Sequence, residues 1–197
     1  MERRELLKQI AILTGGAFIG GEFLLSGCKA GAKVEAGFTP ATIAFLDEVG
    51  ETIIPATQTP GAKAAQVGEL MKVMVTDCYT AKEQTAFTNG IVQLEDACKK
   101  MHGKSFMDCD VKQRTDLLLS LEKEAKAFNE KVGRENEGKK EEDQAPQHYY
   151  TMIKQLTLFG FFTSKTGATE TLRFIQVPGK YDGAYPYKKG DKAWADA

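Results

Sequence analysis

The chain has 197 residues, and its 26 basic and 27 acidic side chains leave a formal net charge of −1. This balance gives no electrostatic footprint for nucleic acid and no polybasic patch for a membrane surface. After removal of an N-terminal signal, the length fits one domain, which can bury roughly 70% of its unfolded surface and so needs no disulfide or metal to be stable.

The N-terminal segment has the layout of an export signal. Arg3 and Arg4 precede an uncharged run over residues 9–21, which is shorter than the roughly twenty apolar residues that a membrane-spanning helix needs. Small residues come directly before Cys28, so a peptidase can reach the backbone there and the thiol can accept a lipid. An amphipathic N-terminal helix with a chance arginine pair is the alternative interpretation.

This segment resembles a twin-arginine signal joined to a lipobox. The residues that match the twin-arginine pattern are Arg3, Arg4, Leu7 and Lys8, and residues 25–28 match the lipobox. The resemblance implies a cleavable signal over residues 1–27, a lipid on Cys28, and export of a protein that is already folded. Residues 28–37 are small and polar and are expected to form a flexible tether.

The remaining chain, residues 38–197, is predicted to be a single all-α domain of about five helices. Apolar residues recur at helical spacing in five stretches, and no stretch alternates with period two for long. The expected helices cover about residues 40–54, 67–78, 80–102, 111–128 and 147–162. Their ends carry start and stop signals: Thr39 before Pro40, a Thr80 to Glu83 capping box, and Gly103 as a C-terminal cap.

Two features of the fourth helix bear on the fold. Its inward face is expected to run from Val111 to Phe128, with Asp108 or Asp110 as its cap. The charged residues that follow, 131–144, are predicted to be a solvated excursion, and an acidic binding site is the alternative.

The cysteines and histidines give little support for a metal or haem site. No two cysteines have CxxC spacing, the two histidines lie far apart in sequence, and the CxxCH motif of covalent haem attachment is absent. Cys98 and Cys109 flank the Gly103 turn, so they can meet as a disulfide in an oxidising compartment. The alternative is that both are small core residues, and Cys78 is expected to be a buried thiol in either case.

Two irregular segments, residues 55–62 and 178–187, are the predicted contact sites for a partner. Both combine rigid backbone with side chains that interfaces favour, because preorganised loops lose little entropy on docking. The candidate residues are Pro55, Pro60, Gly61, Pro178, Gly179, Tyr181, Tyr185 and Tyr187. The alternative is that the two segments only wrap and close the helical domain.

Several motifs occur in an order that resembles one known family. They are Ile53-Ile54-Pro55, Thr59-Pro60-Gly61-Ala62, Phe106, Phe159 to Ser164, and Pro178 to Gly183. With the leader, they make the chain similar to subunit 3 of gluconate 2-dehydrogenase-type complexes. The resemblance implies a small helical protein that accompanies a large flavoprotein subunit of the glucose-methanol-choline type, often with a cytochrome c subunit. It also implies that the small subunit carries the export signal and helps the flavoprotein to mature.

The resemblance therefore predicts a non-catalytic accessory subunit, lipid-anchored at the periplasmic face of the cell envelope. FAD is expected in the partner and no cofactor in this chain. A free-standing helical envelope lipoprotein that binds a ligand or another protein is the first alternative. The second, a catalytic chain, has less support because neither GxGxxG after a strand nor GxSxG is present, and because His102 and His148 both lie at expected helix ends.

Overall fold

The structure is a computed structural model that describes residues 37–177, 179 and 182–195. The predicted signal with Arg3, Arg4, Leu7 and Lys8, the lipidation site Cys28 and almost the whole tether lie outside the described residues, as do Pro178 and Tyr181. Within the described part the chain is all-helical, as predicted, and contains no strand beyond one isolated bridge between Arg173 and Trp194. No helix of this part is long and apolar enough to cross a membrane.

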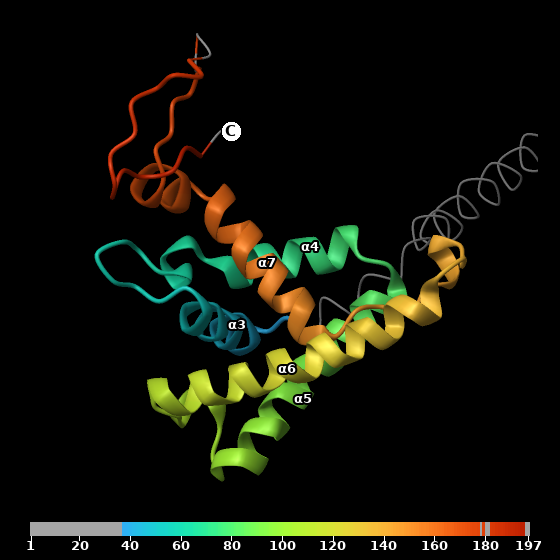
Figure 1. Cartoon of the computed structure of the whole chain (residues 1–197). Coiled ribbons are helices and arrows are strands. Elements are labelled where there is room, and N and C mark those ends of the chain that lie inside the picture. Colours follow the sequence, from blue (N-terminus) through green and yellow to red (C-terminus); the bar gives the residue numbers. More distant parts are fainter. Residues whose placement is uncertain (1–36, 178, 180–181, 196–197) are drawn as a thin grey trace, which may run out of the picture.

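Five α-helices and four short helical turns follow one another along the described chain (Figure 1). The α-helices are α3 (Pro40–Ile53), α4 (Val67–Cys78), α5 (Ala81–His102), α6 (Val111–Asn136) and α7 (Tyr149–Thr163). The short turns are η1 (Ala62–Ala65), η2 (Phe106–Asp108), η3 (Glu141–Asp143) and the π-helical turn η4 (Gly167–Thr171).

The predicted helix caps are confirmed. The Thr39 hydroxyl accepts a hydrogen bond from the Thr42 amide, with Pro40 in the first turn. Thr80 and Glu83 form a reciprocal capping box at the start of α5, and Gly103 ends this helix with a φ of 73°. These short-range hydrogen bonds satisfy backbone groups that a helix leaves unpaired at its ends.

Helix α7 lies at the centre of the fold and contacts α3, α4, α5, α6 and the turns η1 and η4 (Figure 1). Its apolar side chains are buried on several faces, which explains why the sequence from Tyr149 to Phe162 is so rich in large apolar residues. Small residues allow the close crossings. A Cβ built on Gly90 of α5 would lie 2.2 Å from the Cβ of Tyr149, and one on Gly50 of α3 would lie 2.7 Å from a methyl of Val67.

Three sequence predictions about burial and helix length were wrong. Helix α6 continues to Asn136, beyond the expected end, and Val132 is buried, although residues 133–135 and 137–144 are exposed as expected for a solvated segment. Lys131, Arg134 and Glu135 are good helix formers, which favours the continuation of α6. Val111 and Phe128 are 75% and 43% exposed although both were expected to face inward. Cys78 is exposed at the end of α4, whereas a buried thiol was predicted.

An ionic cluster that the sequence did not predict joins α3 to α6. Arg114 pairs with Glu48, and Lys63 approaches the other oxygen of the same carboxylate at 2.8 Å. Arg114 also donates from Nε to the Phe106 carbonyl at 3.0 Å and from its terminal nitrogen to the Met107 carbonyl at 2.8 Å. These hydrogen bonds hold the segment around η2 against the helical body.

Candidate functional site

The first predicted contact segment, residues 55–62, is held in shape by one carboxylate. Glu51 accepts hydrogen bonds from the Ala56 amide at 2.8 Å and the Lys63 amide at 2.9 Å, so it spans the loop from one side to the other. Within the loop, the Thr57 amide donates to the Thr59 carbonyl at 2.9 Å. The loop is therefore rigid through its own hydrogen bonds as well as its prolines.

Gly61 shapes this loop from the inside. It is buried, and a Cβ at this position would lie 2.3 Å from both Glu51 carboxylate oxygens and 2.6 Å from the Ala56 amide nitrogen. Pro60 is half-buried, and Pro55 and the residues up to 58 are exposed. A docking partner would thus reach Pro55 directly, whereas Gly61 would influence docking through the shape of the loop.

The second predicted contact segment belongs to a closed C-terminal tail, residues 172–195. The Arg173 amide donates to the Ala193 carbonyl at 2.7 Å, and the Ala195 amide donates to the Arg173 carbonyl at 2.9 Å. The Lys192 amine donates to the Glu170 carbonyl just before the tail begins. These bonds bring the two ends of the tail together, and Figure 1 shows the tail extending beyond η4 and away from the helices.

Arg173 organises the aromatic side chains of the tail. Its guanidinium carbon lies 4.7 Å from the centre of the Trp194 ring and 5.5 Å from that of Tyr185. The two rings also meet edge to face, with centres 5.3 Å apart. Cation–π contacts of this kind contribute about 0.5–1 kcal/mol at exposed sites. Here they orient the Tyr185 side chain, although Tyr185 is 52% exposed.

The exposed large apolar side chains at this end of the chain form a set that we call the C-terminal aromatic surface. Its members come from the last turns of α7 and from the tail, and they include aromatic residues that interfaces favour. They are Leu158, Phe159, Phe162, Phe174, Ile175, Val177, Tyr185, Tyr187 and Trp194. Tyr187 is 77% exposed, so the tail presents aromatic area to solvent.

The structure brings only part of the predicted contact set to this surface. Tyr185 and Tyr187 belong to it, and Gly179 lies in the same tail with a φ of 39°. Arg173 and Trp194 were not predicted from the sequence. Trp194 is the one tryptophan of the whole sequence, and this could have drawn attention to it, because tryptophan is enriched among the residues that dominate binding energy.

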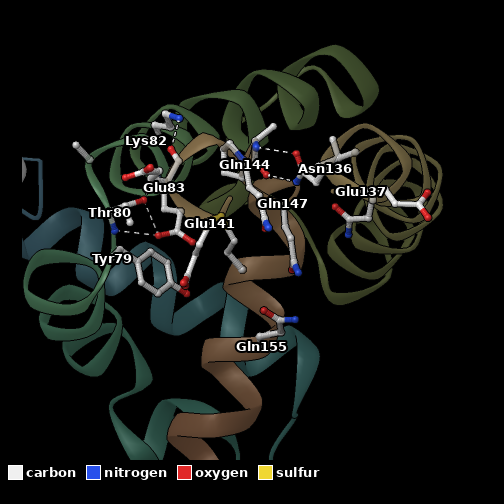
Figure 2. A pocket seen from close by; sticks show the side chains of 18 of the residues that line it. Tyr79, Thr80, Lys82, Glu83, Asn136, Glu137, Glu141, Gln144, Gln147 and Gln155 are labelled. Atoms are coloured by element: carbon white, nitrogen blue, oxygen red, sulfur yellow. Dashed lines mark hydrogen bonds between the residues drawn. The ribbon is translucent and has the colours of Figure 1, made fainter. Parts of the chain in front are cut away.

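A polar groove of about 1320 Å³ lies elsewhere, between the start of α5, the end of α6 and the segment around η3 (Figure 2). Glutamate and amide side chains make up about half of the residues that line it, and Gln155 reaches it from α7. Lys82 crosses one side and donates to the Glu142 carbonyl at 2.8 Å. The groove contains neither a nucleophile paired with a histidine nor, within the described residues, a group of side chains that could hold a metal ion.

Both histidines have structural partners. His148 caps α7: its Nδ1 accepts from the Tyr150 amide at 3.2 Å, and its own amide donates to Asn129 at 2.8 Å. Burial lowers the pKa of His148, which favours the neutral ring that this acceptor role requires. His102 Nε2 lies 3.0 Å from the Gln113 carbonyl of α6.

The cysteine pair is brought together as the sequence predicted it could be. Cys98 and Cys109 are both buried, and their sulfur atoms are 3.4 Å apart as free thiols. This arrangement is compatible with both interpretations of the pair, a disulfide or two small core residues.

The described residues thus form a helical domain with an exposed aromatic tail. A family model for gluconate 2-dehydrogenase subunit 3 matches residues 40–179. The chain therefore belongs to this family, which is a family of dehydrogenase-complex subunits, and its partners are other subunits of such a complex. Neither the curated proteins nor the solved structures contain a match to the chain.

Proposed function

We propose that this chain is a non-catalytic small subunit that escorts, matures and docks a flavin-containing dehydrogenase of the glucose-methanol-choline type. The partner carries FAD and oxidises a sugar or sugar acid at the periplasmic face of the membrane. The observation that carries the docking role is the C-terminal aromatic surface, because large apolar side chains left in solvent commonly mark a protein–protein contact.

The arrangement of that surface supports docking more than ligand binding. Tyr185 and Trp194 are held by Arg173, so their rotamers are restricted before a partner arrives and the entropy lost on binding is small. The tail that carries Tyr185 and Tyr187 extends away from the helices (Figure 1), whereas small-molecule sites are concave. A projecting aromatic surface suits a concave region on a larger subunit.

The leader adds the second half of the proposal. Arg3 and Arg4 direct the chain to the export route for folded proteins, and a lipid on Cys28 retains it at the envelope. A flavoprotein that binds its cofactor in the cytoplasm must cross the membrane folded. A small subunit that binds it first can supply the signal for both.

The docking role is tested with a double variant, Tyr185→Ala with Tyr187→Ala. Aromatic residues at the centre of an interface typically cost 2 kcal/mol or more on truncation, so we expect the dissociation constant for the flavoprotein to rise at least about 30-fold. Val92→Ala is the matched control, because Val92 is 60% exposed on α5, away from the tail, and should change affinity less than about threefold.

The measurement is co-purification from solubilised membranes with a flavin absorbance scan, followed by titration of the separated subunits. An affinity within threefold of the unaltered protein, with an unchanged melting temperature, would contradict docking through this surface. A purified small subunit that has no flavoprotein companion, and that binds a small ligand in the polar groove, would favour the alternative of a free-standing envelope lipoprotein.

The escort role is tested separately with Arg3→Lys and Arg4→Lys together. These changes preserve charge but remove the guanidinium groups, so we expect both this chain and the flavoprotein to accumulate in the cytoplasm. Flavoprotein that reaches the envelope at normal levels with this variant would show that it does not depend on this leader.

A further inference from the structure

We propose that Cys98 and Cys109 are a redox-active dithiol that closes to an intramolecular disulfide and staples the end of α5 to the segment before α6. The geometry is already close to that of the bond. The two sulfur atoms lie 3.4 Å apart, and a disulfide bond is about 2.05 Å long, so the atoms must approach by about 1.4 Å, a movement that two side chains can share.

The surrounding contacts hold the two thiols in place before they react. The Phe106 amide donates to Glu95 of α5 at 3.1 Å, and His102 at the end of α5 meets the Gln113 carbonyl at 3.0 Å. These two links lie on either side of Cys109 in the chain. They tie residues 106–113 to α5, so the cysteine pair is a preorganised contact between two elements.

The third described cysteine shows what an unpartnered thiol looks like in this fold. Cys78 is exposed at the end of α4, whereas Cys98 and Cys109 are buried together. An intramolecular bond is therefore available to one pair only among the cysteines that the structure describes.

The reaction needs an external disulfide as oxidant, such as an oxidised thiol–disulfide exchange protein or, in the test below, oxidised glutathione. Cys109 lies outside the helices and is the more exposed of the two, so its thiolate attacks the external disulfide and releases one thiol. The Cys98 thiolate then displaces the second thiol from the mixed disulfide. In total the pair loses two protons and two electrons, and the external disulfide is reduced to two thiols.

Burial, together with the neighbouring Cys109 sulfur, raises the pKa of Cys98 to about 12. The Cys98 thiolate is therefore scarce at neutral pH, and closure in the folded protein should be slow without a catalyst. The pair should stay reduced in a reducing compartment and close after transfer to an oxidising one. That order of events rests on the proposed envelope location, but the bond itself can be tested on the isolated chain.

The test uses the full chain, purified in the reduced state and equilibrated in glutathione buffers of increasing oxidising strength, both folded and after unfolding and refolding. Remaining thiols are alkylated, and the peptides are mapped by mass spectrometry before and after reduction. We expect one linked peptide pair that contains Cys98 and Cys109. We also expect a rise in melting temperature of about 5–10 °C that reduction reverses, as the loop length and domain size suggest.

Two variants separate this bond from other effects. Cys78→Ser should keep both the linked pair and the temperature shift, and Cys98→Ala with Cys109→Ala should lose both. Full alkylation of Cys98 and Cys109 in the most oxidising buffer after refolding would overturn the proposal. So would a linkage through Cys78, or a bond between Cys98 and Cys109 that leaves the melting temperature unchanged. None of these outcomes bears on docking of the flavoprotein, which is measured separately.

Discussion

Replacing Arg114 by methionine removes the charge that ties α3, η2 and α6 together while keeping a long apolar side chain. Only 13% of the Arg114 side chain is exposed. Its guanidinium pairs with Glu48, donates to the carbonyls of Phe106 and Met107, and lies 5.3 Å from the centre of the Phe106 ring. We expect this variant to be strongly destabilised.

The magnitude follows from the lost partners. Hydrogen bonds to charged groups contribute about 1.5–3 kcal/mol each, but the values for one side chain do not add fully, because they share partners and solvent. Lys63 still neutralises Glu48 in the variant, at 2.8 Å. We therefore expect a loss of about 3 kcal/mol in unfolding free energy, which corresponds to roughly 6–12 °C in melting temperature for a domain of this size.

The assay is denaturant unfolding of Arg114→Met, Glu48→Gln and the double variant. Because Glu48 and Arg114 interact directly, the double-variant cycle should give a coupling energy of about 1–2 kcal/mol. Lys63→Met is the control: its side chain is 59% exposed, so its loss should cost no more than about 1 kcal/mol. A cost below about 0.5 kcal/mol for Arg114→Met, or a coupling energy of zero, would refute the assignment of this cluster as a principal clamp of the fold.

Three further outcomes can be checked by unfolding experiments. The hydrogen bond from Lys63, followed by the contacts of Arg114, lowers the pKa of Glu48. The contribution of Glu48 to stability is therefore complete above its unfolded pKa of about 4.3 and is lost as the pH falls through its lower folded pKa. The unfolding free energy of Glu48→Gln should consequently fall less steeply on acidification than that of the unaltered protein. Equal slopes would argue against this role of Glu48. Gly61→Ala should cost about 1–3 kcal/mol because its Cβ meets the Glu51 carboxylate at 2.3 Å, and an unchanged stability would mean that the loop can move aside. Gly133→Ala should stabilise the protein by about 0.5–1 kcal/mol, because Gly133 is within α6 with nothing near its Cβ; a loss of stability would show that this part of the helix is not formed in solution.

The local features of the fold were predictable from sequence because each depends on residues a few positions apart. The Thr80 to Glu83 capping box and the Gly103 cap are examples, and the structure has both. Helix faces were predictable where large apolar residues repeat, as at Leu94 and Cys98 of α5, which are both fully buried.

Features that depend on distant partners could not be predicted in the same way. Glu48 and Arg114 are 66 positions apart, and charged residues on helices usually face water. Val111 continues the apolar spacing of α6, but it is the first residue of that helix and is 75% exposed. For the candidate docking surface, the tyrosines were visible in the sequence, whereas the pairing of Arg173 with Trp194 depends on how the tail closes.

The central position of α7 sets the order in which this protein can acquire its structure. All four other described α-helices contact α7, yet it is the last of them to be synthesised. Until the ribosome has made it, the earlier helices have no common partner for their apolar faces and cannot complete a core. The core of the described domain therefore cannot close until α7 has been synthesised, however early the other helices form.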